Sequence, residues 1–421
     1  MLGPQSTTFF LLLVVAFAAM IWWLAVAKQV VFRILAACLA FVPAMAFGVA
    51  AVNKYYDYYQ TWNAAITDVF GQNTQVPNLP TTASGASARF NSFLGHEIDV
   101  AVAAQQGYTF HTTVHGQLSD ITRNVYVYLP PQYFQSAYRD YHFPAIELLH
   151  GFPGTPEDWI TVAGVTTMMQ TLTSTGQGQP AVLVMPDANG ARDISLQCIN
   201  QYHGPQDATY LAKDLPLDIS HMLRVQAPGP EWGIAGYSEG GFCAANMALH
   251  YRYRYGLAAS MSGYFSPYRN KWGNPPKLVS PFGSSVALRQ QNTPIDEVRK
   301  IPPGAVMPQF WLGAGTGNKL DVANAQYFAQ ELGLHQAGVP VVLTPGGGHT
   351  MRTWHAEVPA MLTWMTNGLV AAVANRARVL KADKLRAERR AQRAGVRKHH
   401  PATRTHPAGR SSPSSAPSKH R

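Results

Sequence analysis

Two long uncharged stretches near the start of the chain limit most strongly what it can fold into. Phe9–Ala27 and Ile34–Val52 are each 19 residues long and contain no Asp, Glu, Lys or Arg. At about 1.5 Å per residue, either stretch can cross the roughly 30 Å of hydrocarbon in a bilayer as a helix. The first eight residues lack the basic start of a secretory signal, and the second stretch follows at once. We therefore expect residues 1–53 to form a two-helix transmembrane anchor, in preference to a signal sequence followed by one helix.

The connector between the two stretches carries Lys28 and Arg33. Short cytoplasmic loops are enriched in Lys and Arg, so the connector is expected in the cytoplasm and the rest of the chain outside. This predicts a multi-pass protein of the cell membrane with an extracytoplasmic globular domain. The aromatic residues after the second stretch indicate either an interfacial belt or packing against that domain. They are Tyr55, Tyr56, Tyr58, Tyr59 and Trp62.

Composition divides the remainder of the chain into three parts. Residues 54–106 are expected to be an aromatic interfacial segment and linker, because Gln72–Ala88 is rich in Thr, Ser, Pro and Gly. Residues 107–375 have a globular pattern. Residues 376–421 contain 14 basic and two acidic residues, which leaves 19 basic and 21 acidic residues for residues 1–375. The net charge of +10 therefore belongs to a basic tail that we expect to be disordered, and the body shows no sign of nucleic-acid binding.

The tail has two interpretations. Its charge favours attraction to anionic lipid or to an anionic envelope polymer, and a solvated tail without a specific partner is equally consistent with the composition.

Short apolar strands alternate with helical segments across residues 107–375. This alternation predicts an α/β fold with a mostly parallel sheet and helices on both faces. The expected strands are Arg123–Leu129, Pro144–Leu149, Ala181–Met185, Gly233–Tyr237, Leu257–Ser260, Gln309–Gly313 and Val339–Thr344. The expected helices are Asp158–Leu172, Leu211–Leu223, Phe242–His250, Val322–Leu332 and Glu357–Val370. Tyr264–Pro303 breaks the rhythm and could form a wall over a site at the strand ends.

The hexapeptide Gly236-Tyr237-Ser238-Glu239-Gly240-Gly241 lies between an expected strand and an expected helix. A hydrolase nucleophile sits on such a sharp strand-to-helix turn, where crowding requires small neighbours. Ser238 is therefore the candidate nucleophile. A serine needs a base, and His349 follows Gly346-Gly347-Gly348 directly after the last strand, at the edge where Ser238 lies. His335 and His355 fit this role less well, and His150 is expected to order its own loop.

An acid should follow the strand Gln309–Gly313 and orient the imidazole. Asp321 is the only carboxylate in the loop that follows, and its alternative role is to cap the next helix. The expected oxyanion donors are the backbone N–H groups of Glu239 and Phe152, because Pro153 has none. Cys198 and Cys243 lie in the domain, and a disulfide and two buried thiols are equally consistent with them.

These residues carry a resemblance to a known family. The segments Val127–Tyr133, Leu148–Gly151 and Gly347–His349, with Trp159, Trp354 and the serine turn, resemble the Putative esterase family of α/β-hydrolases over roughly Gly107–Met365. That family includes S-formylglutathione hydrolases, feruloyl and enterochelin esterases, and the antigen 85 mycolyltransferases. The resemblance implies an α/β-hydrolase fold, the triad Ser238, Asp321 and His349, and oxyanion donors at Phe152 and Glu239. Exported members with similarly placed cysteines favour a Cys198–Cys243 disulfide.

The chain departs from the family at two places. Asn318 stands where an acid is common, so the acid is assigned to Asp321. Glu239 and Thr350-Met351 stand where mycolyltransferases carry Met and Ser-Trp, which leaves the acyl group open. We expect a serine esterase acting on an acyl ester without metal or cofactor. The alternatives are an envelope acyltransferase that uses a carbohydrate or lipid hydroxyl, and a catalytically inactive envelope-organising module.

Overall fold

The chain is described by a computed structural model that divides it into two compact units, residues 1–373 and 374–421. The described residues are 3–59, 61–62, 65–66, 98–190, 195–266, 281–282, 285–302, 304–336 and 338–398, the last 24 of them by backbone alone. The linker expected at Gln72–Ala88 and the tail beyond Lys398 lie outside these residues.

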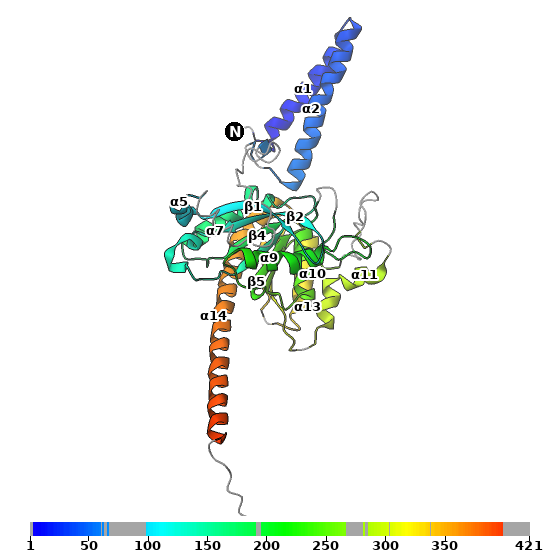
Figure 1. Cartoon of the computed structure of the whole chain (residues 1–421). Coiled ribbons are helices and arrows are strands. Elements are labelled where there is room, and N and C mark those ends of the chain that lie inside the picture. The colour runs from blue at the N-terminus through cyan, green and yellow to red at the C-terminus, as the bar shows by residue number, and fades with distance from the viewer. Residues whose placement is uncertain are drawn as a thin grey trace, which may run out of the picture. The chain divides into compact units, whose positions relative to one another are not determined.

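One eight-stranded sheet forms the centre of the described domain, in the order β1-β2-β4-β3-β5-β6-β7-β8 (Figure 1). Its strands are β1 (Tyr108–His115), β2 (Thr122–Leu129), β3 (Ala145–Leu149), β4 (Val182–Pro186), β5 (Gly229–Tyr237), β6 (Tyr255–Met261), β7 (Gln309–Gly315) and β8 (Val341–Thr344). Neighbours from β4 to β8 are parallel, whereas β2 pairs antiparallel with β1 and β4. The mostly parallel sheet predicted from the sequence is confirmed.

Helices cover both faces of the sheet, and each face has its own hydrophobic core. On one face lie α9 (Leu215–Met222), α10 (Glu239–His250), α12 (Pro294–Lys300) and α13 (Lys319–Leu332). On the other lie α6 (Asp158–Thr161), α7 (Val165–Ser174) and the first part of α14 (Met351–Lys398). Strands β3 and β4 are buried along their whole length, as expected for parallel strands covered on both sides.

Smaller elements complete the domain. They are α5 (Val100–Gln106), α8 (Asp207–Thr209), α11 (Val286–Gln291), the π-helical turn Tyr210–Asp214 and the 3₁₀ turns Pro131–Phe134 and Ser136–Tyr138.

Several element boundaries differ from those expected. Strand β1 was not predicted; it pairs with β2 at the edge of the sheet. Gly164, at φ 66°, separates α6 from α7 where one helix was expected. Helix α13 begins at Lys319 and not near Val322. In the segment expected to form a wall, α12 packs into the core through Ile295 and Val298.

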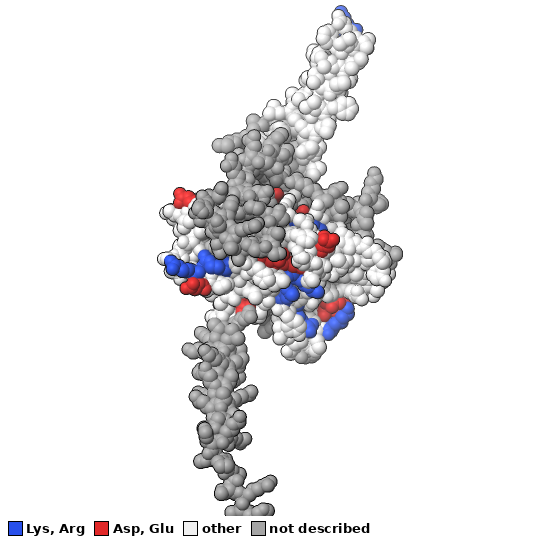
Figure 2. All heavy atoms as spheres, in the orientation of Figure 1, with Lys and Arg blue, Asp and Glu red and all other residues white. Residues whose placement is uncertain are grey.

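Two apolar helices precede the domain, α1 (Thr7–Val26) and α2 (Val30–Tyr56), and they run side by side (Figure 1). Both are long and apolar enough to cross a membrane. No residue of α1 is buried, and the buried residues of α2 are small: Ala36, Ala40, Pro43 and Ala50. On the face that Figure 2 shows, the flank of this pair carries no charged side chain and basic side chains are visible at its tip.

The backbone of residues 376–398 is helical and belongs to α14.

Candidate active site

Ser238 lies at the tip of the turn between β5 and α10. Its backbone has φ 55° and ψ −119°, a strained conformation for a residue with a side chain. The turn requires glycine on both sides. A Cβ on Gly236 would lie 2.1 Å from the carbonyl oxygen of Gly240, and one on Gly240 would lie 2.1 Å from that of Leu149. The tight turn presents the Ser238 hydroxyl beyond the end of β5, at the N-terminus of α10.

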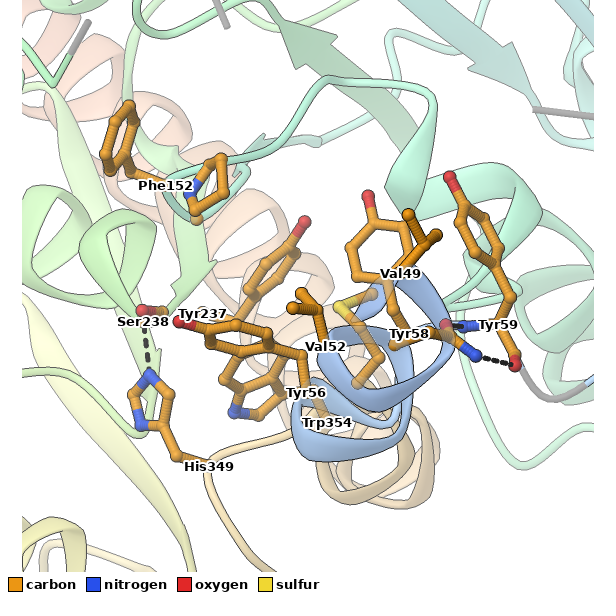
Figure 3. A pocket seen from close by; sticks show the side chains of 14 residues that line it. Val49, Val52, Tyr56, Tyr58, Tyr59, Phe152, Tyr237, Ser238, His349 and Trp354 are labelled. Atoms are coloured by element: carbon orange, nitrogen blue, oxygen red, sulfur yellow. Dashed lines mark hydrogen bonds between the residues drawn. The ribbon is translucent and has the colours of Figure 1, made fainter. Parts of the chain in front are cut away.

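His349 and Asp321 complete a hydrogen-bonded chain to Ser238. His349 Nε2 lies 2.9 Å from Ser238 Oγ, and its Nδ1 lies 2.8 Å from Asp321 Oδ2 (Figure 3 draws the first contact). Since an ionised carboxylate can only accept, Nδ1 carries the proton and Nε2 can accept one from the serine. The Asp321 side chain is 6% exposed and that of His349 is 34% exposed, so the imidazole is partly accessible and its carboxylate partner is buried.

The structure separates two roles that Asp321 could have. Asn318 is the N-cap of α13, and its side-chain oxygen accepts from the backbone N–H groups of Leu320 and Asp321. Asp321 therefore does not cap the helix. Its carboxylate points to His349 from the first turn of α13.

The other candidate histidines are held elsewhere. His150 is buried; its Nδ1 donates to the carbonyl of Gly151, and its Nε2 accepts from the N–H of Ala188. His150 therefore joins the loop after β3 to the loop after β4. His355 lies on an exposed face of α14 with Nδ1 3.1 Å from the carbonyl of Ala163.

The loop after β4 is fastened to the start of α10 by two contacts. Cys198 and Cys243 form a disulfide with Cα atoms 5.5 Å apart. The hydroxyl of Ser195 donates to the buried carboxylate of Glu239, the residue after Ser238. Burial raises the pKa of Glu239. The side chain is a structural tie and is not among the residues that line the cavity at Ser238. Its backbone N–H stays at the free end of α10.

A cavity of about 290 Å³ opens at Ser238, and its lining is mainly aromatic and aliphatic (Figure 3). Tyr237, Trp354 and Phe152 contribute from the domain, and Trp354 contacts the His349 ring edge to face at 5.1 Å. A second cavity of about 840 Å³ also borders His349, and Ser262, Asn324 and Thr350 contribute to its lining. The two cavities share Tyr56 and His349, so the imidazole borders both an apolar and a more polar space.

The residues of α2 that line the first cavity were not predicted. Val49, Val52, Asn53 and Tyr56 come from the second apolar helix, and Tyr58 and Tyr59 follow it. The aromatic run after α2 was interpreted as an interfacial belt or as packing against the domain. Tyr58 packs against the domain, whereas Tyr55 is 77% exposed.

Glu357 was also missed as a residue near the site. Glu357 is buried, and its carboxyl group accepts a hydrogen bond from the hydroxyl of Thr344. This carboxyl group lies so close to Gly313 of β7 that a Cβ on Gly313 would clash with it. Burial, together with the nearby Asp321, raises the pKa of Glu357 to about 8. This carboxyl is therefore neutral at neutral pH and adds no second charge beside Asp321. Within the described residues, no group of three or more His, Cys, Asp or Glu side chains could hold a metal ion.

Comparison with known proteins agrees with this geometry. The family model described as "Putative esterase" matches residues 119–365, more than half of the chain. The chain belongs to this esterase family. An uncharacterised protein of Corynebacterium glutamicum is 25% identical over 249 residues, which cover 58% of this chain and 57% of that protein. The similarity therefore spans little more than half of that relative's length.

Solved structures of several esterases share the fold. A ferulic acid esterase superposes with a TM-score of 0.53 at 21% identity, over 63% of this chain and 99% of that one. An S-formylglutathione hydrolase from Agrobacterium tumefaciens gives 0.52 at 16% identity, over 63% and 96%. The Staphylococcus aureus fluorophosphonate-binding serine hydrolase F gives 0.50 at 17% identity, over 62% and 98%. The esterase domain of this chain thus has the α/β-hydrolase fold.

Proposed function

We propose that this protein is a membrane-anchored serine esterase that cleaves an acyl ester through an acyl-enzyme intermediate. The observation that carries the proposal is the continuous hydrogen-bonded chain from Asp321 through His349 to Ser238, which ends on a strained turn at the start of α10. Membership of the esterase family supports the same chemistry.

In the first half of the reaction, Ser238 Oγ attacks the ester carbonyl carbon while His349 Nε2 takes the hydroxyl proton. Asp321 keeps the proton on Nδ1 and stabilises the imidazolium that forms. The negative oxygen of the tetrahedral intermediate is placed beside the backbone N–H groups of Glu239 and Phe152, with the free end of α10 behind it. The carbon–oxygen bond to the alcohol then breaks, and His349 returns its proton to the leaving oxygen.

In the second half, a water molecule loses a proton to His349 and attacks the acyl-enzyme, which releases the carboxylic acid and restores Ser238. Acyl transfer is the alternative, with the hydroxyl of a carbohydrate or lipid in place of water. The larger cavity beside His349 supports this second candidate, because Ser262, Asn324 and Thr350 contribute hydroxyl and amide groups to its lining.

The proposed location of the enzyme is a membrane, and the two apolar helices support this. Helices α1 and α2 span the bilayer, the connector with Lys28 and Arg33 lies in the cytoplasm, and the esterase domain lies outside. The Cys198–Cys243 disulfide supports an extracytoplasmic domain, because disulfides persist in oxidising compartments. The basic tail is available to an anionic lipid or envelope polymer.

Labelling with a fluorophosphonate tests the nucleophile. We expect the full-length protein in detergent to be labelled at Ser238, and Ser238→Ala and His349→Ala to lose both labelling and hydrolysis of p-nitrophenyl acetate. Folded protein that is neither labelled nor active would instead support an inactive envelope-organising module. Adding a sugar or lipid acceptor to the same assay separates hydrolysis from transfer by the product formed.

A further inference from the structure

The apolar cavity at Ser238 is built from two parts of the chain. Val49, Val52, Asn53 and Tyr56 of α2 contribute one wall, and the esterase domain contributes the remainder (Figure 3). A domain of this fold has its own strand-end surface for substrate, yet here the last two turns of an apolar helix close part of it. The wall is therefore a feature of this chain that its esterase domain alone does not supply.

Polar contacts fix the end of α2 against the domain. The Tyr58 hydroxyl donates to the carboxylate of Asp158, which is 1% exposed and also accepts from the hydroxyl of Tyr237 at 3.3 Å. Burial and the nearby carboxylate raise the pKa of Tyr58, so its hydroxyl keeps the proton that it donates. Tyr237 directly precedes Ser238, so a continuous set of contacts runs from the anchor to the turn that carries the serine.

A second set of contacts holds the chain where it leaves α2. Asp57 forms an ion pair with Arg352 at 2.6 Å, beside the cavity residue Met351. The Asn53 side chain accepts from the Tyr59 N–H at 2.7 Å and donates to the Tyr59 carbonyl at 2.9 Å. These bonds reverse the chain direction and hold the α2 wall in one place.

The uncharged run of α2 ends at Val52, two residues before Lys54. In a helix that crosses a bilayer, such an end lies at the boundary between hydrocarbon and headgroups. Val49 and Val52 are 68% and 58% exposed and also line the cavity, so the wall is continuous with the lipid-facing side of the helix.

We infer that the apolar cavity receives the acyl chain of a membrane-lipid ester, which reaches Ser238 along α2 directly from the bilayer. This inference rests on the proposed function, because it names the substrate class of the same serine site. The ester bond then lies at Ser238, and the headgroup or acyl acceptor lies in the more polar cavity that also borders His349. Each methylene of the acyl chain that is buried in the cavity should raise kcat/KM about fourfold until the cavity is full.

The first test compares acyl lengths on the full-length protein in lipid nanodiscs, with p-nitrophenyl acetate, butyrate and octanoate as substrates. We expect kcat/KM to rise with chain length, and Val52→Trp and Val49→Trp to lower the octanoate-to-acetate ratio by about tenfold or more. Val42→Trp is the matched control, because Val42 is a valine of α2 that is 64% exposed and is not among the residues lining the cavity. It should keep the wild-type ratio.

The second test locates the chain directly. A fluorophosphonate whose alkyl chain ends in a diazirine reacts with Ser238 as the Oγ–P bond forms and fluoride leaves with the serine proton. Light then expels N₂, and the carbene inserts into a neighbouring C–H bond. We expect the cross-linked peptide to contain residues 49–56.

The outcomes separate the two proposals. Absence of both Ser238 labelling and acetate hydrolysis would overturn the proposed function. A labelled, acetate-active enzyme with a ratio insensitive to the tryptophan variants, and cross-links confined to the esterase domain, would overturn only the acyl-chain inference.

Discussion

Replacing Asp321 with Asn removes one negative charge from the buried end of the hydrogen-bonded chain and leaves the side-chain volume almost unchanged. In the wild type, the Asp321 carboxylate lies 2.8 Å from His349 Nδ1 and is 6% exposed. When His349 becomes an imidazolium, two unit charges about 4 Å apart at an effective dielectric of about 20 interact by about 4 kcal/mol. Loss of that term from the transition state corresponds to about a 1000-fold lower kcat.

Solvent reduces this value, because His349 is 34% exposed. We therefore expect Asp321→Asn to lower kcat by about 100- to 1000-fold, with a small effect on KM, since the charge pair forms only after proton transfer. The assay is p-nitrophenyl ester hydrolysis by the full-length protein. Glu297→Gln is the control, because it removes a carboxylate from the first turn of the neighbouring helix α12. Near-wild-type kcat in Asp321→Asn, with a lowered unfolding temperature, would show that Asp321 only stabilises α13 and would refute the assignment.

Three further predictions concern the scaffold. Gly240→Ala should abolish Ser238 labelling and lower the unfolding temperature, because its Cβ would meet a carbonyl oxygen at 2.1 Å, whereas Gly48→Ala has open space and should change neither. Replacing Cys198 and Cys243 together by Ala should cost about 4 kcal/mol of unfolding free energy, the loop-entropy value for a separation of 45 residues, and equal stability of the variant would contradict this. Glu357 holds a proton up to a pKa of about 8, whereas the unfolded chain releases it near 4.5, so stability should fall as pH rises between these values. Glu357→Gln should make that fall shallower, as measured by thermal unfolding across the pH range.

The esterase fold and the arrangement of Ser238, His349 and Asp321 could be anticipated because their signals are local. The glycines that crowd the strand-to-helix turn lie within a few residues of Ser238, and another run of glycines directly precedes His349 after the last strand. The catalytic roles themselves stay a prediction, whereas their hydrogen-bonded contact is a property of the structure.

Contacts between distant segments were not predictable in the same way. An aromatic run after an apolar helix has one composition whether it meets headgroups or a protein surface, so the bond from Tyr58 to Asp158 left no sign in the sequence. Glu357 reads as an ordinary polar position of a helix, and only its place opposite Gly313 of β7 shows that it is buried. The start of α13 was misplaced because Asn318 was judged as a missing acid and not as a cap.

The hydrogen bond between Tyr58 and Asp158 has a practical consequence for anyone who seeks inhibitors. A soluble fragment without the hydrophobic helices and Tyr58 would lack one wall of the cavity. It would also lack the Tyr58 hydroxyl that donates to the buried carboxylate of Asp158. Compounds selected against such a fragment would be fitted to a shallower and wetter depression than the one in the intact protein. Screening against the whole chain in a lipid environment keeps the cavity complete, with both the α2 wall and the wall formed by the esterase domain.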